Sequence, residues 1–462
     1  MTIPTFMGLQ TALSGLEAAQ AAIDTTGQNI ANASTPGYSR QTVDLTEQAA
    51  LTIPSLSSDN GGGSQLGTGV TVADITRVRD TFLDSQYRSQ NSQTSADNTN
   101  TTILGQAQAS LNEPTSSGLS AVMDTFWQGF NTYAASPNQD GSTQTIIGNG
   151  QAVADSLNTL AGQITTLQSQ VTQQYDTLTD PTSGAVASDA NEIAQLNGQI
   201  AQAQAAGISA NNLEDQRDNA IDDLSQYSNV YVSTQPNGMV NVSFGNAATS
   251  AQNGTTDATP LVDGSTVNLS QNLTDSNLNG SSGTLGALLG EYDANPAGGG
   301  APTGTLVNYM DSLNTVANQL VTTVNNAIST ADPQGATAPA FFDPSGTTAA
   351  TIAVNSSVTN STTPYTAAEA TAVSQLTGGQ AEQSYQAFVA QVGGDVQSAQ
   401  NAQSTSQSLL TAISNQRQSV SGVSLDEEMT NLIQYQQAYQ ASARVESTIN
   451  DTFTSLLDMV SG

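Results

Sequence analysis

Residues Phe6–Arg40 read FMGLQTALSGLEAAQAAIDTTGQNIANASTPGYSR, and the organisation of the rest of the chain follows from this segment. Apolar residues recur every seven positions within it, at Leu9, Leu16, Ile23 and Ile30, with Phe6 and Leu13 between them. Such a repeat is typical of an amphipathic helix that packs against a partner helix. Pro36-Gly37 then predicts a stop, because proline disfavours helix in the residue before it. We therefore expect one helix over residues 5–32 that requires a partner.

A matching amphipathic segment lies near the other end of the sequence, from Leu425 to Val460. Its apolar residues alternate in spacings of three and four, and a capping-box pattern, Ser424 to Glu427, opens it. As a helix it would be about 54 Å long at 1.5 Å per residue. Neither end helix has an apolar face wide enough for burial on all sides. We expect the two to pair as a coiled coil, and the repeats fit pairing within one chain or between chains equally well.

The intervening chain is predicted to be mainly α-helical with a β-rich insert. Residues 119–135 are the most hydrophobic helical segment, and Asn237-Gly238 between two alternating runs predicts a β-hairpin. The expected architecture is a long antiparallel helical bundle with a smaller β-rich domain. Three domains follow: a terminal coiled-coil assembly domain (1–40 with 422–462), a helical bundle domain (41–228 with 283–331 and 376–421) that carries a β-hairpin near 39–76, and a β-rich domain (229–282 with 332–375).

The charge composition excludes several classes of partner. The chain has 39 acidic residues against seven arginines, a formal net charge of -32, and neither Lys nor His. Such a surface repels phosphate backbones and anionic lipid, so we expect no nucleic-acid partner. The sequence also contains no run of about 18 apolar residues, which predicts no membrane insertion.

The missing residue types also remove most catalytic chemistry. Without His and Cys, a Ser-His-Asp triad, a thiolate nucleophile and a zinc site of the usual ligands are impossible. Carboxylates remain, but Glu427-Glu428 is explained by its position at the start of a helix. The run from Asp275 to Gly280 resembles half of a calcium loop and lacks the closing glutamate. We therefore predict no catalytic, cofactor-binding or metal-binding residues, and no cofactor.

Six segments resemble the axial proteins of the bacterial flagellum, the family of rod, hook and hook-associated proteins. They are SGLEAAQ (14–20), NIANASTPGYSR (29–40), GVSLDEEMTNL (422–432), YQQAYQASAR (435–444), NNLEDQRD (211–218) and TLGALL (284–289). The likeness is strongest to the hook-associated members. The β-rich parts match nothing specific.

This resemblance implies a non-enzymatic structural subunit of the junction between hook and filament, located outside the cell. It implies export through the flagellar type III apparatus without a cleaved signal peptide. The implied partners are other copies of itself in a ring, the hook protein below, a second junction protein and the filament above, and an export chaperone on the C-terminal helix.

The assembly interface expected from the repeats and the resemblance comprises eighteen residues. They are Leu9, Leu13, Leu16, Ile23, Ile30, Asn32, Pro36, Gly37, Tyr38, Arg40, Leu425, Met429, Leu432, Tyr435, Tyr439, Ile449, Phe453 and Leu456.

Two alternatives stay open at this point. One is a hook or distal-rod structural subunit. The other, from a different class, is a secreted peptidoglycan hydrolase that uses two carboxylates about 5–10 Å apart.

Overall fold

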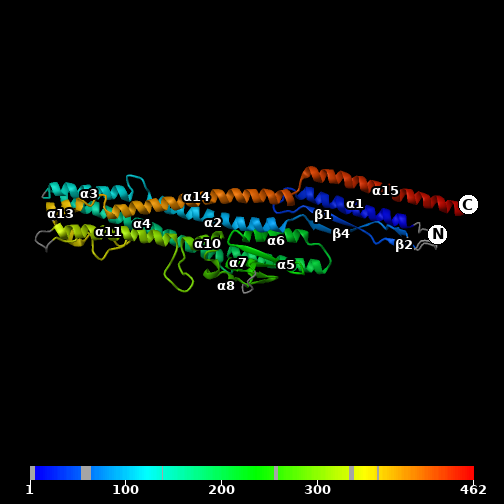
Figure 1. Cartoon of the computed structure of the whole chain (residues 1–462), viewed down its shortest axis with the longest axis horizontal. Helices are drawn as coiled ribbons and strands as arrows, with labels where there is room; N and C mark the ends of the chain where they lie inside the picture. The colour runs from blue at the N-terminus through cyan, green and yellow to red at the C-terminus, as the bar shows by residue number, and fades with distance from the viewer. Residues whose placement is uncertain are drawn as a thin grey trace.

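The first and last helices, α1 (Phe6–Asn32) and α15 (Leu425–Ser461), lie side by side at one end of an elongated molecule (Figure 1). The computed structural model describes residues 6–53, 64–137, 139–253, 259–331, 338–361 and 364–461. The predicted pairing of the two end helices is confirmed, and it occurs within one chain.

A β-ribbon leaves the end of α1 and lies against it. Strand β1 (Gln41–Glu47) pairs antiparallel with β4 (Val70–Arg77), and the short strands β2 (Leu51–Ile53) and β3 (Ser64–Leu66) pair beyond them. The backbone N–H of Val70 donates to the Ser14 hydroxyl at 3.4 Å, so one face of α1 is covered by the ribbon.

The body of the molecule is a bundle of long helices. Its members are α2 (Thr81–Leu111), α3 (Leu119–Ala135), α4 (Ser142–Thr179), α5 (Ala185–Ala205), α6 (Asn211–Leu224), α10 (Gly283–Glu291), α11 (Thr305–Ala331), α13 (Ala367–Ser374) and α14 (Gln380–Ser421). Helix α14 runs along α2 toward the terminal pair (Figure 1). In α11, Leu306, Leu313 and Leu320 repeat every seven residues and are fully buried. The apolar stripe of each helix is therefore what holds the bundle together.

An aromatic cluster closes the end of the bundle that is far from the termini. The ring centroid of Phe126 lies 4.8 Å from that of Trp127, 5.4 Å from Phe341 and 5.7 Å from Phe342. The Phe126–Trp127 pair is edge-on and the other two are tilted, and aromatic pairs at this spacing are favourable beyond simple area burial. Trp127 also donates its indole N–H to the buried carboxylate of Glu382, which ties α3 to α14.

Among the described residues of 229–282, the β structure is confined to one small sheet. It contains β5 (Val230–Thr234), β6 (Val240–Phe244), β7 (Val262–Asp263) and β8 (Thr266–Val267) in that order, with α7 (Asn246–Gln252), α8 (Leu269–Asn272) and α9 (Asp275–Leu278) attached.

The second segment assigned to the β-rich domain differs from the expectation. Of its described part, 338–361 and 364–375, only the single bridge Phe342–Val354 is β structure, and the short helices α12 (Ser356–Thr359) and α13 lie in it. The reason is that Phe341 and Phe342 insert into the aromatic cluster, so this segment packs on α3 and α11 instead of joining the sheet. Residues 332–337 and 362–363 lie outside the described part. Among the described helices, none is both long and apolar enough to cross a membrane.

We expect Phe126→Ala to lower the free energy of unfolding by about 3–5 kcal/mol, because it empties a fully buried ring site. Fluorescence of Trp127, the single tryptophan, during urea unfolding measures the loss. Phe82→Ala is the control, since Phe82 is 66% exposed and should change stability by no more than about 0.5 kcal/mol. Equal losses in both variants would show that the cluster is not the core of this end.

Candidate assembly site

Helices α1 and α15 run antiparallel and meet along a face of small residues. A Cβ atom on Gly8 would lie 3.2 Å from Ile449, one on Gly15 would lie 3.0 Å from Ser442, and Asn29 bonds Glu428. The buried side chains of α1 include Ala12, Ala18, Ala19, Ala22, Thr25 and Thr26. Because these side chains are short, the two backbones approach closely.

Most of the heptad residues predicted to fill this seam are only partly buried or exposed, although Ile449 packs against Gly8 within it. Leu9, Leu16, Ile23 and Ile30 are half-buried, and Leu13 is 48% exposed. On α15, Leu432, Tyr435, Ile449 and Phe453 are half-buried, whereas Leu425, Met429, Tyr439 and Leu456 are exposed. The side chains of Phe6 and Val460 lie outside the described part. The large apolar residues are therefore only partly used by the pairing within the chain.

Asn29 joins three segments where the terminal coil meets the body. Its amide nitrogen donates to the Gln41 carbonyl at 2.9 Å and to Glu428 at 3.1 Å. Its amide oxygen accepts from the Gln41 N–H at 3.0 Å and the Tyr38 hydroxyl at 2.9 Å. The side chain is 1% exposed, so every one of these bonds replaces water that burial has removed.

The turn after α1 docks onto helix α6. The Ser39 N–H and hydroxyl both donate to Asp215, at 3.0 and 2.7 Å. Gly37 has φ of 74°, and the Asn219 side chain occupies the space where a Cβ would lie. A side chain at position 37 would therefore clash with α6 as well as strain the backbone. Asn32 is half-buried and bonds its own helix, Pro36 is exposed, and Arg40 pairs with Glu427 at 3.1 Å.

A network of buried charges connects the ribbon, α2, α6 and α14. Arg77 binds Glu214, Asp215 and Asp218 at 2.8–2.9 Å. Arg79 and Arg88 also reach Asp218, and Arg417 of α14 reaches Asp222 at 2.6 Å. Burial raises the pKa of Asp218, but attraction to Arg79, Arg88 and Arg77 outweighs it and lowers that pKa to about 2. Burial, with Asp215 and Glu428 nearby, raises the pKa of Tyr38 to about 12.

The charged groups of this network pair across segments rather than with their neighbours in sequence. Arg217 is within reach of Glu214 on the same helix, yet Arg77 of the ribbon takes Glu214 and Arg217 bonds Asn197 and a backbone carbonyl instead. The Ser424 hydroxyl accepts the Glu427 N–H at 3.5 Å, but the Glu427 carboxylate turns to Arg40 rather than completing a capping box. Asn29, Asp215 and Glu428 are not among the eighteen residues predicted for the interface. Asn29 does not occupy a position of the repeat formed by Leu9, Leu16, Ile23 and Ile30, so the repeat gave no signal for it.

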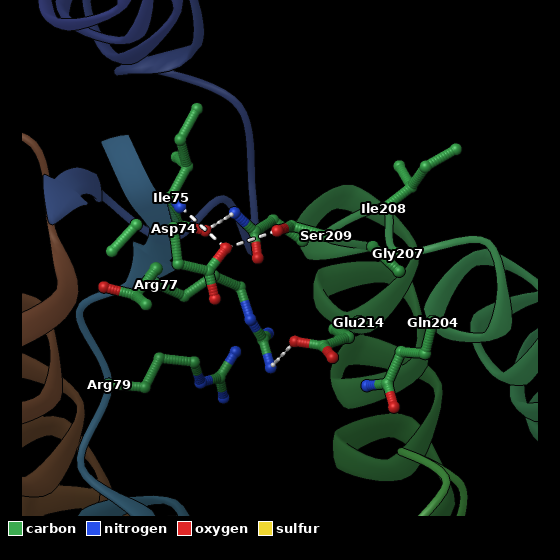
Figure 2. Close-up of a pocket in the computed structure, with 13 residues that line it drawn as sticks. Asp74, Ile75, Arg77, Arg79, Gln204, Gly207, Ile208, Ser209 and Glu214 are labelled. Atoms are coloured by element: carbon green, nitrogen blue, oxygen red, sulfur yellow. Dashed lines mark hydrogen bonds and ion pairs between the residues drawn. The ribbon is translucent and has the colours of Figure 1, made fainter. Parts of the chain in front are cut away.

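A polar recess of about 580 Å³ lies between β4 and the loop that joins α5 to α6 (Figure 2). Ser209 donates to Asp74, and Arg77 and Glu214 point toward each other and pair at 2.9 Å. Asn211 donates to the Ile75 carbonyl at 2.6 Å. These contacts fasten the ribbon to the body. Among the described residues, no three His, Cys, Asp or Glu side chains are grouped to hold a metal ion.

Asn29→Ala should lower the free energy of unfolding by about 2 kcal/mol or more, because it leaves the buried Glu428 carboxylate and the half-buried Tyr38 hydroxyl without their partner. Thermal unfolding and the rate of proteolysis in residues 33–40 measure the effect. Asn32→Ala is the matched control, since the half-buried Asn32 amide makes only local bonds, to the Gln28 carbonyl of its own helix and from the Thr35 hydroxyl. Unchanged proteolysis in Asn29→Ala would contradict the role assigned to this residue.

Asp218→Asn should be less stable than the wild type by about 2 kcal/mol or more at pH 7. This difference in stability should shrink as pH falls from 3.8 through 2. Over that range the Asp218 carboxylate becomes protonated and loses its attraction to the arginines, which stabilises the folded state only while Asp218 is ionised. Guanidinium unfolding followed by circular dichroism across this range measures it. Asp223→Asn, exposed on the same helix, should show no such loss at pH 7. A difference that stays constant from pH 7 to 2 would refute the electrostatic origin.

Known proteins similar to this chain are flagellar. The family model for the helical domain of flagellar hook-associated protein FlgK matches residues 104–342. The model for the C-terminal part of the flagellar basal body rod FlgEFG proteins matches 414–459, and that for the flagella basal body rod protein matches 9–38.

Two relatives span nearly the full length. Flagellar hook-associated protein 1 of Bacillus subtilis (strain 168) is 32% identical, covering 99% of this chain and 98% of its own. The protein of the same name from Escherichia coli (strain K12) is 26% identical, covering 98% and 99%. A solved structure of the flagellar hook junction protein FlgK from Burkholderia pseudomallei is 24% identical with a TM-score of 0.45, covering 56% of this chain and 46% of that one.

Proposed function

Because the chain belongs to the family of flagellar hook-associated protein 1, we propose that its terminal coil packs against other copies of itself to form a ring. The protein is a structural subunit of the bacterial flagellum, at the junction between hook and filament. The finer proposal concerns which surfaces make the ring and what lies on either side of it.

The observation that carries the proposal is the set of large apolar residues that the coil leaves exposed. Leu425, Met429 and Ile433 follow one another at a spacing of four and are 50–53% exposed. Residues at this spacing lie on one face of a helix. An uncovered stripe of this kind is typical of a surface that binds another protein.

The half-buried stripe of α1 lies where a neighbour can reach it. Thr11 and Ser14 face the ribbon, because a Cβ on Gly69 would contact both. Leu9 is two residues from Thr11, and Leu16 is two residues from Ser14. At about 100° per residue, each leucine therefore lies on the side of the helix opposite the ribbon. The ribbon therefore covers one side of α1 and leaves the leucine side free. We propose that the eighteen predicted residues act there and at the adjoining turn, with Leu16 and Met429 in the seam between copies.

We propose the same partners that the family resemblance implies. The hook protein would lie below the ring, and a second junction protein and the filament above it. An export chaperone would bind α15, whose exposed apolar residues extend to Leu457 and Met459, at 68% and 73% exposure. Export would use the flagellar type III route without a cleaved signal peptide. The division into an assembly coil, a helical body and a β-rich part remains part of this proposal.

The two alternatives are less well supported. The matches to rod models at 9–38 and 414–459 fit a hook or rod subunit, but both relatives that span the chain carry the hook-associated name. No relative supports the hydrolase, and we propose that the protein has no enzymatic activity. A peptidoglycan zymogram tests this: a clear band would overturn the structural assignment.

We expect Leu16→Asp and Met429→Asp each to abolish filament attachment, because a carboxylate would be buried without a partner at the seam between copies. Motility on soft agar and electron microscopy of the hook end measure the effect in a strain that lacks the wild-type protein. Filament subunits should appear in the medium.

Glu17→Gln is the matched control, since Glu17 is exposed beside Leu16 and should leave motility intact. Circular dichroism of the purified variants must show a folded body. Normal motility of the Leu16→Asp strain would contradict the proposal that Leu16 lies in the contact between copies.

A further inference from the structure

The arginines of this chain are concentrated in one region, although the chain as a whole is strongly acidic. Six of the seven lie where the terminal coil and the ribbon meet the body of the molecule, which we call the joint. These six are Arg40, Arg77, Arg79, Arg88, Arg217 and Arg417, whereas Arg444 lies on α15. A cavity of about 350 Å³ between α2, α6 and the β5–β6 strands is lined by four of them, Arg77, Arg79, Arg88 and Arg217. Two carboxylates, Asp84 and Asp218, share this lining. Three further carboxylates outside this lining, Glu214, Asp215 and Asp222, pair with Arg77 and Arg88. Of the four lining arginines, only Arg217 forms no ion pair within the described residues.

Both carboxylates are already engaged. Asp84 pairs with Arg79 at 2.7 Å, and Asp218 is held by Arg77 at 2.8 Å and by Arg79 and Arg88 at 3.3 and 3.4 Å. Neither of them forms an ion pair with Arg217, so its charge is not matched by direct contact within the described residues.

Arg217 is the unusual member of the group. It is 6% exposed, and its Nη1 donates to the Gly238 carbonyl at 2.7 Å and to Asn197 Oδ1 at 3.2 Å. Its Nε is buried without a hydrogen-bond partner among the described residues. Burial lowers the pKa of Arg217; Asp218 and Glu214 oppose this, while Arg77 and Arg88 lower it further. A guanidinium buried in this way is costly unless an anion or further hydrogen bonds compensate it.

The chemistry of the cavity indicates what would compensate it. Guanidinium groups bind the oxygens of tetrahedral oxyanions through paired N–H donors. Thr81 and Ser85 add hydroxyl groups to the same lining. Water occupies about 30 Å³ per molecule in the liquid, so the cavity has room for a small oxyanion together with several waters.

We propose that this cavity binds one small inorganic oxyanion, sulfate or phosphate, with Arg217 as the principal ligand. The anion would fix the β5–β6 strands against α2 and α6 beside the joint. The assembly proposal does not require this anion site, so the failure of one proposal would not count against the other.

Equilibrium dialysis of the full chain against radiolabelled sulfate tests the proposal, and labelled phosphate forms a second arm. We expect saturable binding of one anion per chain, with no competition by chloride at equal ionic strength. Arg217→Gln should weaken binding at least about tenfold, because a charge-assisted hydrogen bond is lost. Arg217→Lys keeps the positive charge, so its affinity for the anion should lie between those of the wild type and Arg217→Gln.

Ser85→Glu gives an independent variant, since Ser85 is exposed and its replacement adds a negative charge to the cavity without removing a buried group. It should fold normally and lose binding to a similar degree. Arg444→Gln, on the exposed surface of α15, is the matched control and should bind as the wild type does. No saturable binding by the wild type, or full affinity in Ser85→Glu, would overturn the proposal.

Discussion

The buried charge network around Asp218 is the constraint on which the rest of the molecule depends. It lies where the terminal coil, the ribbon, α2, α6 and α14 converge, and Asp218 alone accepts from three arginines. Charges withdrawn from water are tolerated only when opposite charges and hydrogen bonds surround them closely. Segments more than a hundred residues apart in sequence must therefore reach one place for any of these groups to be stable. The network fixes how the coil meets the body, and a chain with only seven cations uses most of them there.

The seam between α1 and α15 follows from this anchoring and bears on assembly. Since Asn29 and Glu428 lock one end of the pair, the antiparallel register places Gly15 opposite Ser442 and Gly8 opposite Ile449. Small residues of α1 then fill its side of the contact, Ile449 of α15 packs against Gly8, and most of the other large apolar residues stay at the margin. A coil of this kind is held by its own chain in one register and still leaves apolar side chains such as Leu425 and Met429 exposed.

Much of the architecture could be predicted from the spacing of apolar residues. The repeat in Phe6–Arg40 and its counterpart from Leu425 onward predicted two helices, their limits and their pairing, because a helix with a narrow apolar stripe has few other ways to bury it. The segment around Phe341 was less predictable. An apolar pair such as Phe341-Phe342 can be expected to anchor a loop, but only the tertiary structure shows that Phe341 packs against Phe126 and Phe130.

The sequence alone therefore established the helical end segments, the flagellar family and the absence of histidine, cysteine and lysine chemistry. It could not establish which face of α1 meets α15, because Ala and Leu stripes share the same heptad and the choice depends on how closely two backbones approach. Nor could it pair Arg77 with Glu214 and Asp215 in place of the nearer Arg217. Electrostatic partners across 138 residues are set by distance in space, and that distance exists only once the ribbon has folded back onto α6.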